Sequence, residues 1–217
     1  MTNVQTWSVE SGAPLQSFLE WPECPQVVRE ALTGVLSWQA RNETSIGRAL
    51  RAPVIAPQWV AALLAWGVTV SIAGDDVAEL PIADALDQRL AGQVARVYVP
   101  VGPPEQAWER RWGEAHVART PADERIVSVT AVVDLAEDVI QEARLTLTGV
   151  ADAPVVLATA AGGLAHIRLA AADFAAIAAA VGQEVSPRED MLGSAEYRRA
   201  MAGVLTRRAL DACRQVR

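Results

Sequence analysis

Two long runs of strand-forming residues follow each other in the second half of this chain, at Ile126 to Leu135 and at Glu142 to Val150. Both are rich in valine, leucine and threonine, and Ala136-Glu137-Asp138 between them is typical of a hairpin turn. A third, shorter run spans Val155 to Thr159. Because paired strands bury one face against another layer, we expect a three-stranded antiparallel sheet covered by helices.

Two helices are predicted to cover this sheet. Ala170 to Val181 places its apolar residues on one helical face and is followed by Gly182, and Gly193 to Leu210 is typical of a single terminal helix. Between them, the segment Ser186-Pro187-Arg188-Glu189 has two interpretations, either a short capped helix or a loop ordered by Asp190.

The first half alternates helical and strand patterns. Apolar residues recur at helical spacing from Gln26 to Gln39 and from Gln58 to Trp66, and the second segment has a proline before it and a glycine after it. Alternating residues predict strands from Val68 to Ile72 and from Val94 to Val99. This half therefore predicts a few antiparallel strands with helices.

The segment between the two halves, residues 102–121, mixes proline, glutamate, tryptophan and arginine with weak periodicity. It predicts either a connection or a short strand with an interface face. The change in sequence character near residues 119–125 predicts two domains, residues 1–118 and 119–217. The expected fold class is α+β.

Composition narrows the function classes. The net charge of −7 and the pI near 4.9 argue against nucleic-acid or anionic-membrane partners. All 19 basic residues are arginine, which excludes lysine chemistry. Cys24 and Cys213 have no neighbouring ligand at metal spacing, and His116 and His166 have no triad or metal partner, so we expect no metal site and no catalytic residue. Without a membrane span or a leader, a cytoplasmic protein is expected.

The run from Gly193 to Leu210, Gly-Ser-Ala-Glu-Tyr-Arg-Arg followed by Arg-Arg-Ala-Leu, resembles the closing signature of a known family. This family is the FAD-binding medium subunit of molybdenum hydroxylases, of the carbon monoxide dehydrogenase and xanthine dehydrogenase type. Val127 to Ala131 and Ala143 to Val150 resemble strands of its C-terminal domain, in which Gly149 keeps one of two family glycines. Ser37 to Ala49 resembles the family's Gln-Ile-Arg-Asn-x-Gly-Thr-Ile-Gly-Gly-Asn loop.

The resemblance implies FAD as the cofactor, with its pyrophosphate held at Ser45, Ile46, Gly47 and Arg48. Ser45-Ile46-Gly47 match the family's Thr-Ile-Gly, whereas other positions depart from the pattern: Thr44, Arg48 and Ala49 replace two glycines and an asparagine, and Gln58 replaces an acidic residue that helps to hold the adenosine. Arg48 keeps two interpretations, since its guanidinium either pairs with phosphate or faces solvent or a salt bridge.

Family members also carry an N-terminal lobe with a glycine-rich loop, and Val4 to Ala13 resembles the segment just after it. We therefore expect residues 1–118 to be a truncated FAD-binding-type domain, its second lobe, and residues 119–217 to be the family's C-terminal domain. The expected function is a scaffold or docking subunit without a complete flavin site of its own. The alternative is a functional FAD-binding electron-transfer subunit whose missing lobe is supplied by another chain.

The implied partners are molybdenum and iron–sulfur subunits or a homo-oligomer, so the chain is at most the flavin subunit of a multi-subunit oxidoreductase. In the terminal helix, Tyr197, Met201, Val204 and Leu205 are expected to form the apolar stripe. This helix is expected either simply to dock on its own domain or, through Tyr197 and an arginine-rich surface that includes Arg198 and Arg199, to help the domain dock on a partner subunit. Trp21, Trp108 and Trp112 are further interface candidates.

Overall fold

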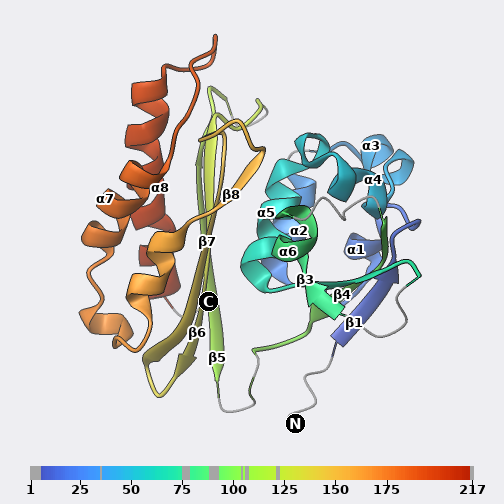
Figure 1. Ribbon diagram of the computed structural model, residues 1–217, viewed down its shortest axis with the longest axis horizontal. Coiled ribbons are helices and arrows are strands. Elements are labelled where there is room, and N and C mark those ends of the chain that lie inside the picture. The colour runs from blue at the N-terminus through green and yellow to red at the C-terminus, as the bar shows by residue number, and fades with distance from the viewer. Residues whose placement is uncertain are drawn as a thin grey trace. The chain divides into compact units, whose positions relative to one another are not determined.

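The computed structural model describes residues 6–34, 36–74, 79–87, 93–103, 105, 108–120 and 123–215 (Figure 1). The chain divides into two compact units, Met1–Gly102 and Pro103–Arg217. Each unit has one antiparallel sheet with helices, so the α+β class predicted from the sequence is confirmed. No helix in the described ranges is both long and apolar enough to cross a membrane.

The first unit is built on a four-stranded antiparallel sheet with the order β1-β4-β2-β3. Its strands are β1 (Thr6–Glu10), β2 (Thr69–Ile72), β3 (Glu79–Pro81) and β4 (Val94–Pro100). Its helical segments are α1 (Ser17–Glu20), α2 (Gln26–Thr33), α3 (Trp38–Glu43), α4 (Ile46–Arg51), η1 (Pro53–Ile55), α5 (Pro57–Trp66) and α6 (Ile82–Asp87). Asp75 and Asp76, which follow β2 in the sequence, lie outside the described residues.

The core of the first unit is formed around α5, which is buried at every position from Gln58 to Trp66. The helix starts with Pro57 and ends at Gly67, whose φ of 79° gives the left-handed cap that the sequence predicts. Trp59 of α5 is fully buried, and its ring meets Phe18 edge to face at 5.3 Å. Apolar residues on all sides of one helix thus make it the centre of this unit.

Trp21 belongs to the same aromatic core. Its ring stacks on Trp7 at 4.3 Å, and Trp7 in turn meets Phe18 edge to face at 5.1 Å. Trp21 is only 6% exposed. Its prediction as an interface residue is therefore wrong, because the turn after α1 folds this ring back onto β1.

The predicted helix from Gln26 to Gln39 consists of two helices. α2 ends at Thr33, with Gly34 as its C-cap, and α3 starts at Trp38. The side chain of Ser37 accepts a hydrogen bond from Ala40 N at 3.2 Å, so it caps a new helix. Local capping therefore divides a segment whose apolar pattern is continuous.

The second unit has a four-stranded antiparallel sheet with the order β5-β6-β7-β8. The strands are β5 (Glu109–Val117), β6 (Val127–Ala136), β7 (Val139–Thr148) and β8 (Val155–Leu157). β6, β7 and β8 confirm the three predicted strands, and the positive φ values of Glu137 and Asp138 form the predicted hairpin turn. β5 is a fourth strand in the segment that the sequence left open between a connection and a strand.

Because β5 pairs with β6, it belongs to the second unit and moves the boundary between the units to before β5. It pairs with β6 over its whole length, from Glu109↔Leu135 to Val117↔Val127. The compact units separate between Gly102 and Pro103, whereas the boundary predicted from the sequence falls after residue 118. The alternation of charged and aromatic residues in β5 concealed its strand pattern, because charged residues occupy both of its faces.

Two helices and two 3₁₀ segments cover one face of this sheet (Figure 1). They are η3 (Thr159–Leu164), η4 (Leu169–Ala171), α7 (Phe174–Glu184) and α8 (Ala195–Cys213). α7 begins at Phe174 because the Asp173 carboxylate accepts hydrogen bonds from Ala175 N and Ala176 N. Residues 185–189 are irregular, so of the two interpretations of this segment the loop ordered by Asp190 is confirmed.

The other face of the sheet is polar and carries a buried ion triad. Asp134 of β6 is fully buried. It accepts two hydrogen bonds from Arg110 of β5, at 2.6 and 2.8 Å, and one from Arg144 of β7 at 2.9 Å. One carboxylate therefore joins three neighbouring strands through two guanidinium groups, of which Arg144 also pairs with Glu142 on its own strand.

We expect Asp134→Ala to lower the free energy of unfolding by about 3 to 5 kcal/mol, because it removes the fully buried carboxylate that pairs with the buried guanidinium group of Arg110 and with Arg144. Glu109→Ala is the matched control. It removes the carboxylate of an exposed pair with Arg111 and should cost about 1 kcal/mol or less. Urea unfolding followed by circular dichroism measures both. Equal losses in the two variants would contradict the role of the triad.

Candidate functional site

The four residues predicted to bind the pyrophosphate lie together where α3 passes into α4. The side chain of Ser45 is the N-cap of α4 and accepts a hydrogen bond from Arg48 N at 3.2 Å. Ile46 is fully buried, while Gly47 and Arg48 lie on the outer side of the first turn. The loop therefore has the local form expected of a helix start, a serine cap followed by a short helix of six residues.

The backbone N–H groups of this first turn all have partners within the protein. Ile46 N donates to Ala13 O at 2.9 Å, and Gly47 N donates to Ser11 O at 2.7 Å. Arg48 N is satisfied by the Ser45 cap. The carbonyl groups come from the turn that follows β1, so this turn has the position that an anion would need in order to be bound by the same donors.

Gly47 contributes to the same packing. A Cβ atom at this position would lie 3.2 Å from both Cβ and O of Ser11, a tight contact that Ser11 would have to relieve by a small shift. The side of Gly47 where a Cβ would lie is thus closed by Ser11 and is not open to a ligand. The glycine allows close approach, as the sequence predicts, but what approaches is the chain itself.

A depression of about 180 Å³ lies on the outer side of this loop. Arg48 and Arg51, three positions apart on α4, both line it, and both are exposed. Neither has an ion-pair partner among the residues that the structure describes. Arg48 therefore has no salt bridge within the described residues, and whether it pairs with phosphate or faces solvent stays open. The full lining is Ser11, Gly12, Ser45, Gly47, Arg48, Arg51 and Val94.

These residues do not fit a flavin pyrophosphate held by backbone N–H groups, because the donors of the first turn already bond to Ser11, Ala13 and Ser45. Gln58, predicted to replace the acidic residue at the adenosine, is only 4% exposed, and its Oε1 has no hydrogen-bond partner in the described part of the chain. A side chain buried in this way presents no group to a ribose at the surface.

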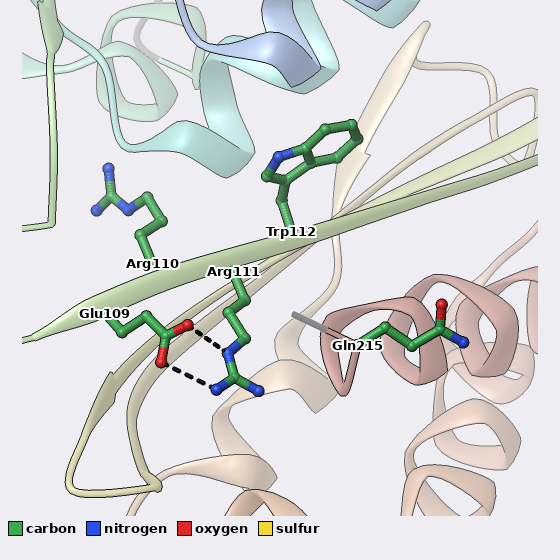
Figure 2. Close-up of a pocket in the computed structure, with 5 residues that line it drawn as sticks. All are labelled: Glu109, Arg110, Arg111, Trp112 and Gln215. Atoms are coloured by element: carbon green, nitrogen blue, oxygen red, sulfur yellow. Dashed lines mark hydrogen bonds and ion pairs between the residues drawn. The ribbon is translucent and has the colours of Figure 1, made fainter. Parts of the chain in front are cut away.

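A second, smaller pocket of about 90 Å³ lies between the start of β5 and the end of α8. Figure 2 shows Glu109 and Arg111 turned toward each other on one side of the strand and Arg110 and Trp112 on the other side. Arg111 donates to both Glu109 oxygens, at 2.8 and 2.9 Å, which lowers the pKa of Glu109 and raises that of Arg111. The charges of Glu109 and Arg111 thus compensate each other and are not available to a ligand.

The signature of the terminal helix forms a structural site in the second unit. The side chain of Ser194 caps α8 by accepting a hydrogen bond from Tyr197 N at 3.1 Å. Arg198 is 6% exposed, and its Nη1 donates to Ile126 O at 2.7 Å and to Gly149 O at 3.0 Å. Its Nη2 donates to both carboxylate oxygens of Asp190, at 2.7 and 2.6 Å. We name this arrangement the Arg198 clamp.

The other members of the clamp depend on this geometry. Asp190 also accepts hydrogen bonds from Leu192 N at 2.8 Å and Gly193 N at 3.2 Å, so it holds the turn before α8. Gly149 has φ of 74°, and a Cβ there would lie 2.1 Å from Ile126 O. Only glycine fits at this position. The clamp therefore ties α8 to the start of β6 and the end of β7.

Two predictions about α8 are wrong. Arg198 does not belong to an exposed docking surface, because its guanidinium is inside the clamp. The predicted apolar stripe is rotated from the real one, since Tyr197 is 38% and Val204 is 41% exposed. The buried positions of α8 are Arg198, Ala202, Leu205, Thr206, Ala209, Leu210 and Cys213.

Comparison with known proteins identifies this second unit. Residues 115–213 match the family model of the CO dehydrogenase flavoprotein C-terminal domain. These residues belong to that family. The resemblance predicted from the signature is thereby confirmed, and the Arg198 clamp is what the signature builds in this flavoprotein C-terminal domain. No curated protein matches the chain in sequence.

Solved structures share the fold over nearly the whole chain. Carbon monoxide dehydrogenase from Hydrogenophaga pseudoflava has a TM-score of 0.78 at 21% identity, over 96% of this chain and 75% of that chain. The enzyme from Oligotropha carboxidovorans has a TM-score of 0.75 at 18% identity, over 95% and 74%. Quinoline 2-oxidoreductase from Pseudomonas putida 86 has 0.74 at 20%, over 99% and 77%. At these identities the likeness shows a shared fold.

His116 and Cys24, the remaining titratable candidates, lie in surroundings that pair or bury their side chains. His116 lies 3.6 Å from Glu114, and burial together with Arg125 lowers its pKa. Burial raises the pKa of the Cys24 thiol to about 12, which keeps it protonated and unreactive. Within the described ranges, no three His, Cys, Asp or Glu side chains lie close enough to hold a metal ion.

Sequence reasoning missed two contributors to the depression. Arg51 has the signal of its spacing, three residues after Arg48, which places both on one face of a helix. Ser11 has a weaker signal, because only the pairing of its backbone with α4 brings it to the loop. Trp108 and Trp112 are half-buried, and their interface role stays a prediction.

We expect Arg198→Ala to lower the free energy of unfolding by about 3 kcal/mol, because it leaves the buried carbonyl oxygens of Ile126 and Gly149 without their donor. Arg199→Ala is the matched control, since Arg199 is exposed and has no side-chain partner in the described part of the chain. Its effect should stay within about 0.5 kcal/mol. Chemical denaturation compares them, and a control as unstable as Arg198→Ala would refute the clamp.

The clamp also predicts a pH dependence. Hydrogen bonds from Arg198, and then from Leu192 N, hold the pKa of Asp190 below its usual value. A carboxyl whose pKa is lower when folded stabilises the fold above its unfolded pKa of about 4 and loses that contribution as the pH falls through the folded value. The difference in urea midpoint between wild type and Asp190→Asn should therefore be largest near neutral pH and shrink below about pH 4. In an Arg198→Ala background the same difference should vary much less with pH.

Proposed function

We propose that this chain is a relative of the FAD-binding subunit of molybdenum hydroxylases that does not bind FAD by itself and serves as a scaffold or docking subunit. The observation that carries the proposal is the hydrogen bonding of the loop. The N–H groups of Ile46 and Gly47 bond to Ala13 O and Ser11 O, and Arg48 N bonds to the Ser45 cap. A loop whose donors are all satisfied internally gains nothing from a pyrophosphate at those donors.

The comparisons supply the context for the scaffold role. One relative is described as carbon monoxide dehydrogenase that lacks the Mo-pyranopterin moiety of its molybdenum cofactor, and another as a Cu,Mo-CO dehydrogenase. A chain with the fold of these enzymes and a C-terminal domain of their flavoprotein family has a scaffold suited to molybdenum and iron–sulfur subunits. On this proposal those subunits, or a second copy of this chain, are its partners, and any substrate is bound elsewhere.

FAD binding tests the proposal directly. We expect the purified full chain to be colourless, with no flavin absorbance, and to give no binding heat when FAD is titrated into it by calorimetry. ADP in a parallel titration separates the adenosine part from the isoalloxazine part. A yellow protein with near-stoichiometric flavin would refute the proposal.

A second candidate is a functional flavin subunit that another chain completes. The observation in its favour is α3, all of whose residues lie in the described part of the chain and none of which is buried. Trp38 at its start is 67% exposed, and tryptophan is a residue type enriched at protein interfaces. Co-expression with the products of neighbouring genes, followed by FAD titration of the complex, tests this candidate. It fails if the complex forms and still binds no FAD.

A further inference from the structure

We propose that the outer side of α8 is a self-association surface, on which a second copy of this chain docks with its own α8 running antiparallel. The inference names one partner for the docking role proposed above and rests on that role. Residues of α8 supply the contact, so it requires neither a flavin nor a site in the first unit.

Four residues at intervals of four form one ridge along the outer side of α8. They are Glu196, Ala200, Val204 and Arg208, and all four are exposed. We name them the α8 ridge. The opposite side of the helix is buried against the sheet, which α7 and α8 cover together (Figure 1). The ridge therefore points away from the core of its own unit.

The middle of the α8 ridge is apolar and open to close approach. Val204 is 41% exposed, and Tyr197 beside the ridge is 38% exposed. The neighbouring helix α7 presents short side chains to solvent, at Ala175, Ala176, Ala179 and Ala180. Because alanine side chains project so little, α7 does not hold another helix away from the ridge.

The two ends of the α8 ridge carry opposite charges. Glu196 lies at one end and Arg208 at the other, and neither makes a side-chain hydrogen bond or ion pair with another described residue. By contrast, Arg207 and Asp211 on the same helix pair with each other at 3.7 Å. The order along the ridge is therefore acidic, apolar, apolar, basic, with both charges uncompensated within the described part of the chain.

This order is complementary to itself when the second helix runs in the opposite direction. In an antiparallel pair with a two-fold axis at the middle of the ridge, Glu196 of each copy faces Arg208 of the other. Ala200 of each copy then faces Val204 of the other. A parallel pair would bring like charges together at both ends, and these repel. Ridges of residues spaced by four also give the commonest class of helix packing.

The size of the ridge predicts the strength of the contact. A helix of 19 residues is about 28 Å long, so one helix pair makes a small interface of the kind found in transient complexes. We therefore expect a reversible dimer whose population rises with protein concentration. Salt should weaken it, because its ion pairs lie at the surface.

Sedimentation equilibrium of the full chain in low-salt buffer, at concentrations up to about 0.5 mM, tests the inference. We expect a monomer–dimer equilibrium that Glu196→Arg and Arg208→Glu each weaken at least about tenfold, because each substitution makes two attractive pairs repulsive. A mixture of the two variants should form the dimer again, since every facing pair then has opposite charges. Arg168→Glu is the matched control, because Arg168 is exposed and lies outside α8.

A wild type that stays monomeric over this range overturns the inference, as expected if α8 docks on a different subunit. Equal association of the wild type and both variants also overturns it, and so does a mixture no more associated than either variant alone. Equal weakening by Arg168→Glu overturns it as well, since net charge would then be the cause. Urea midpoints show that each variant is folded. FAD binding in a separate titration would refute the proposed function, whereas a monomeric wild type would refute only this inference.

Discussion

The Arg198 clamp is the interaction on which the second unit depends. One guanidinium group satisfies two backbone carbonyl groups at the ends of β6 and β7 and a carboxylate in the turn before α8. The long terminal helix is thereby fixed to the sheet at its first turn, and Gly113 lets it approach β5 closely farther along, since a Cβ there would overlap Ala209 O. A motif that identifies a family by sequence is thus a structural device, and its presence says nothing directly about redox chemistry.

Much of the fold could be predicted because its signals are local. Residues close together in the sequence predict three of its features: the hairpin of β6 and β7, the left-handed glycine after α5 and the helix that Ser194 caps. β5 and the break between α2 and α3 were harder. The strand pattern of β5 is concealed by arginines such as Arg110 that reach partners on the next strand, and the break depends on whether Ser37 caps a helix. Both outcomes are decided by competition between interactions of similar size.

The position of the candidate loop was predictable, but its chemical state was not. The pattern at Ser45 to Gly47 identified a helix start with a glycine, as the structure has it. Whether its N–H groups are free depends on a turn more than thirty residues earlier in the chain, whose carbonyl oxygens reach Ile46 and Gly47. The predictions for Trp21 and Arg198 are wrong for the same reason. The partner of an aromatic or charged side chain comes from a distant segment, so it cannot be identified from neighbouring residues.

The bonding of Ile46 and Gly47 to the turn after β1 also bears on how such a protein matures. A cofactor loop with free donors is incomplete until its ligand arrives, and its apo form exposes polar backbone that water must solvate. A loop that closes on its own carbonyl groups reaches its final shape during folding. On the proposed function, in which this loop binds no flavin, the first unit should therefore mature at the same rate in riboflavin-starved and riboflavin-replete cells, so that its abundance does not depend on vitamin supply.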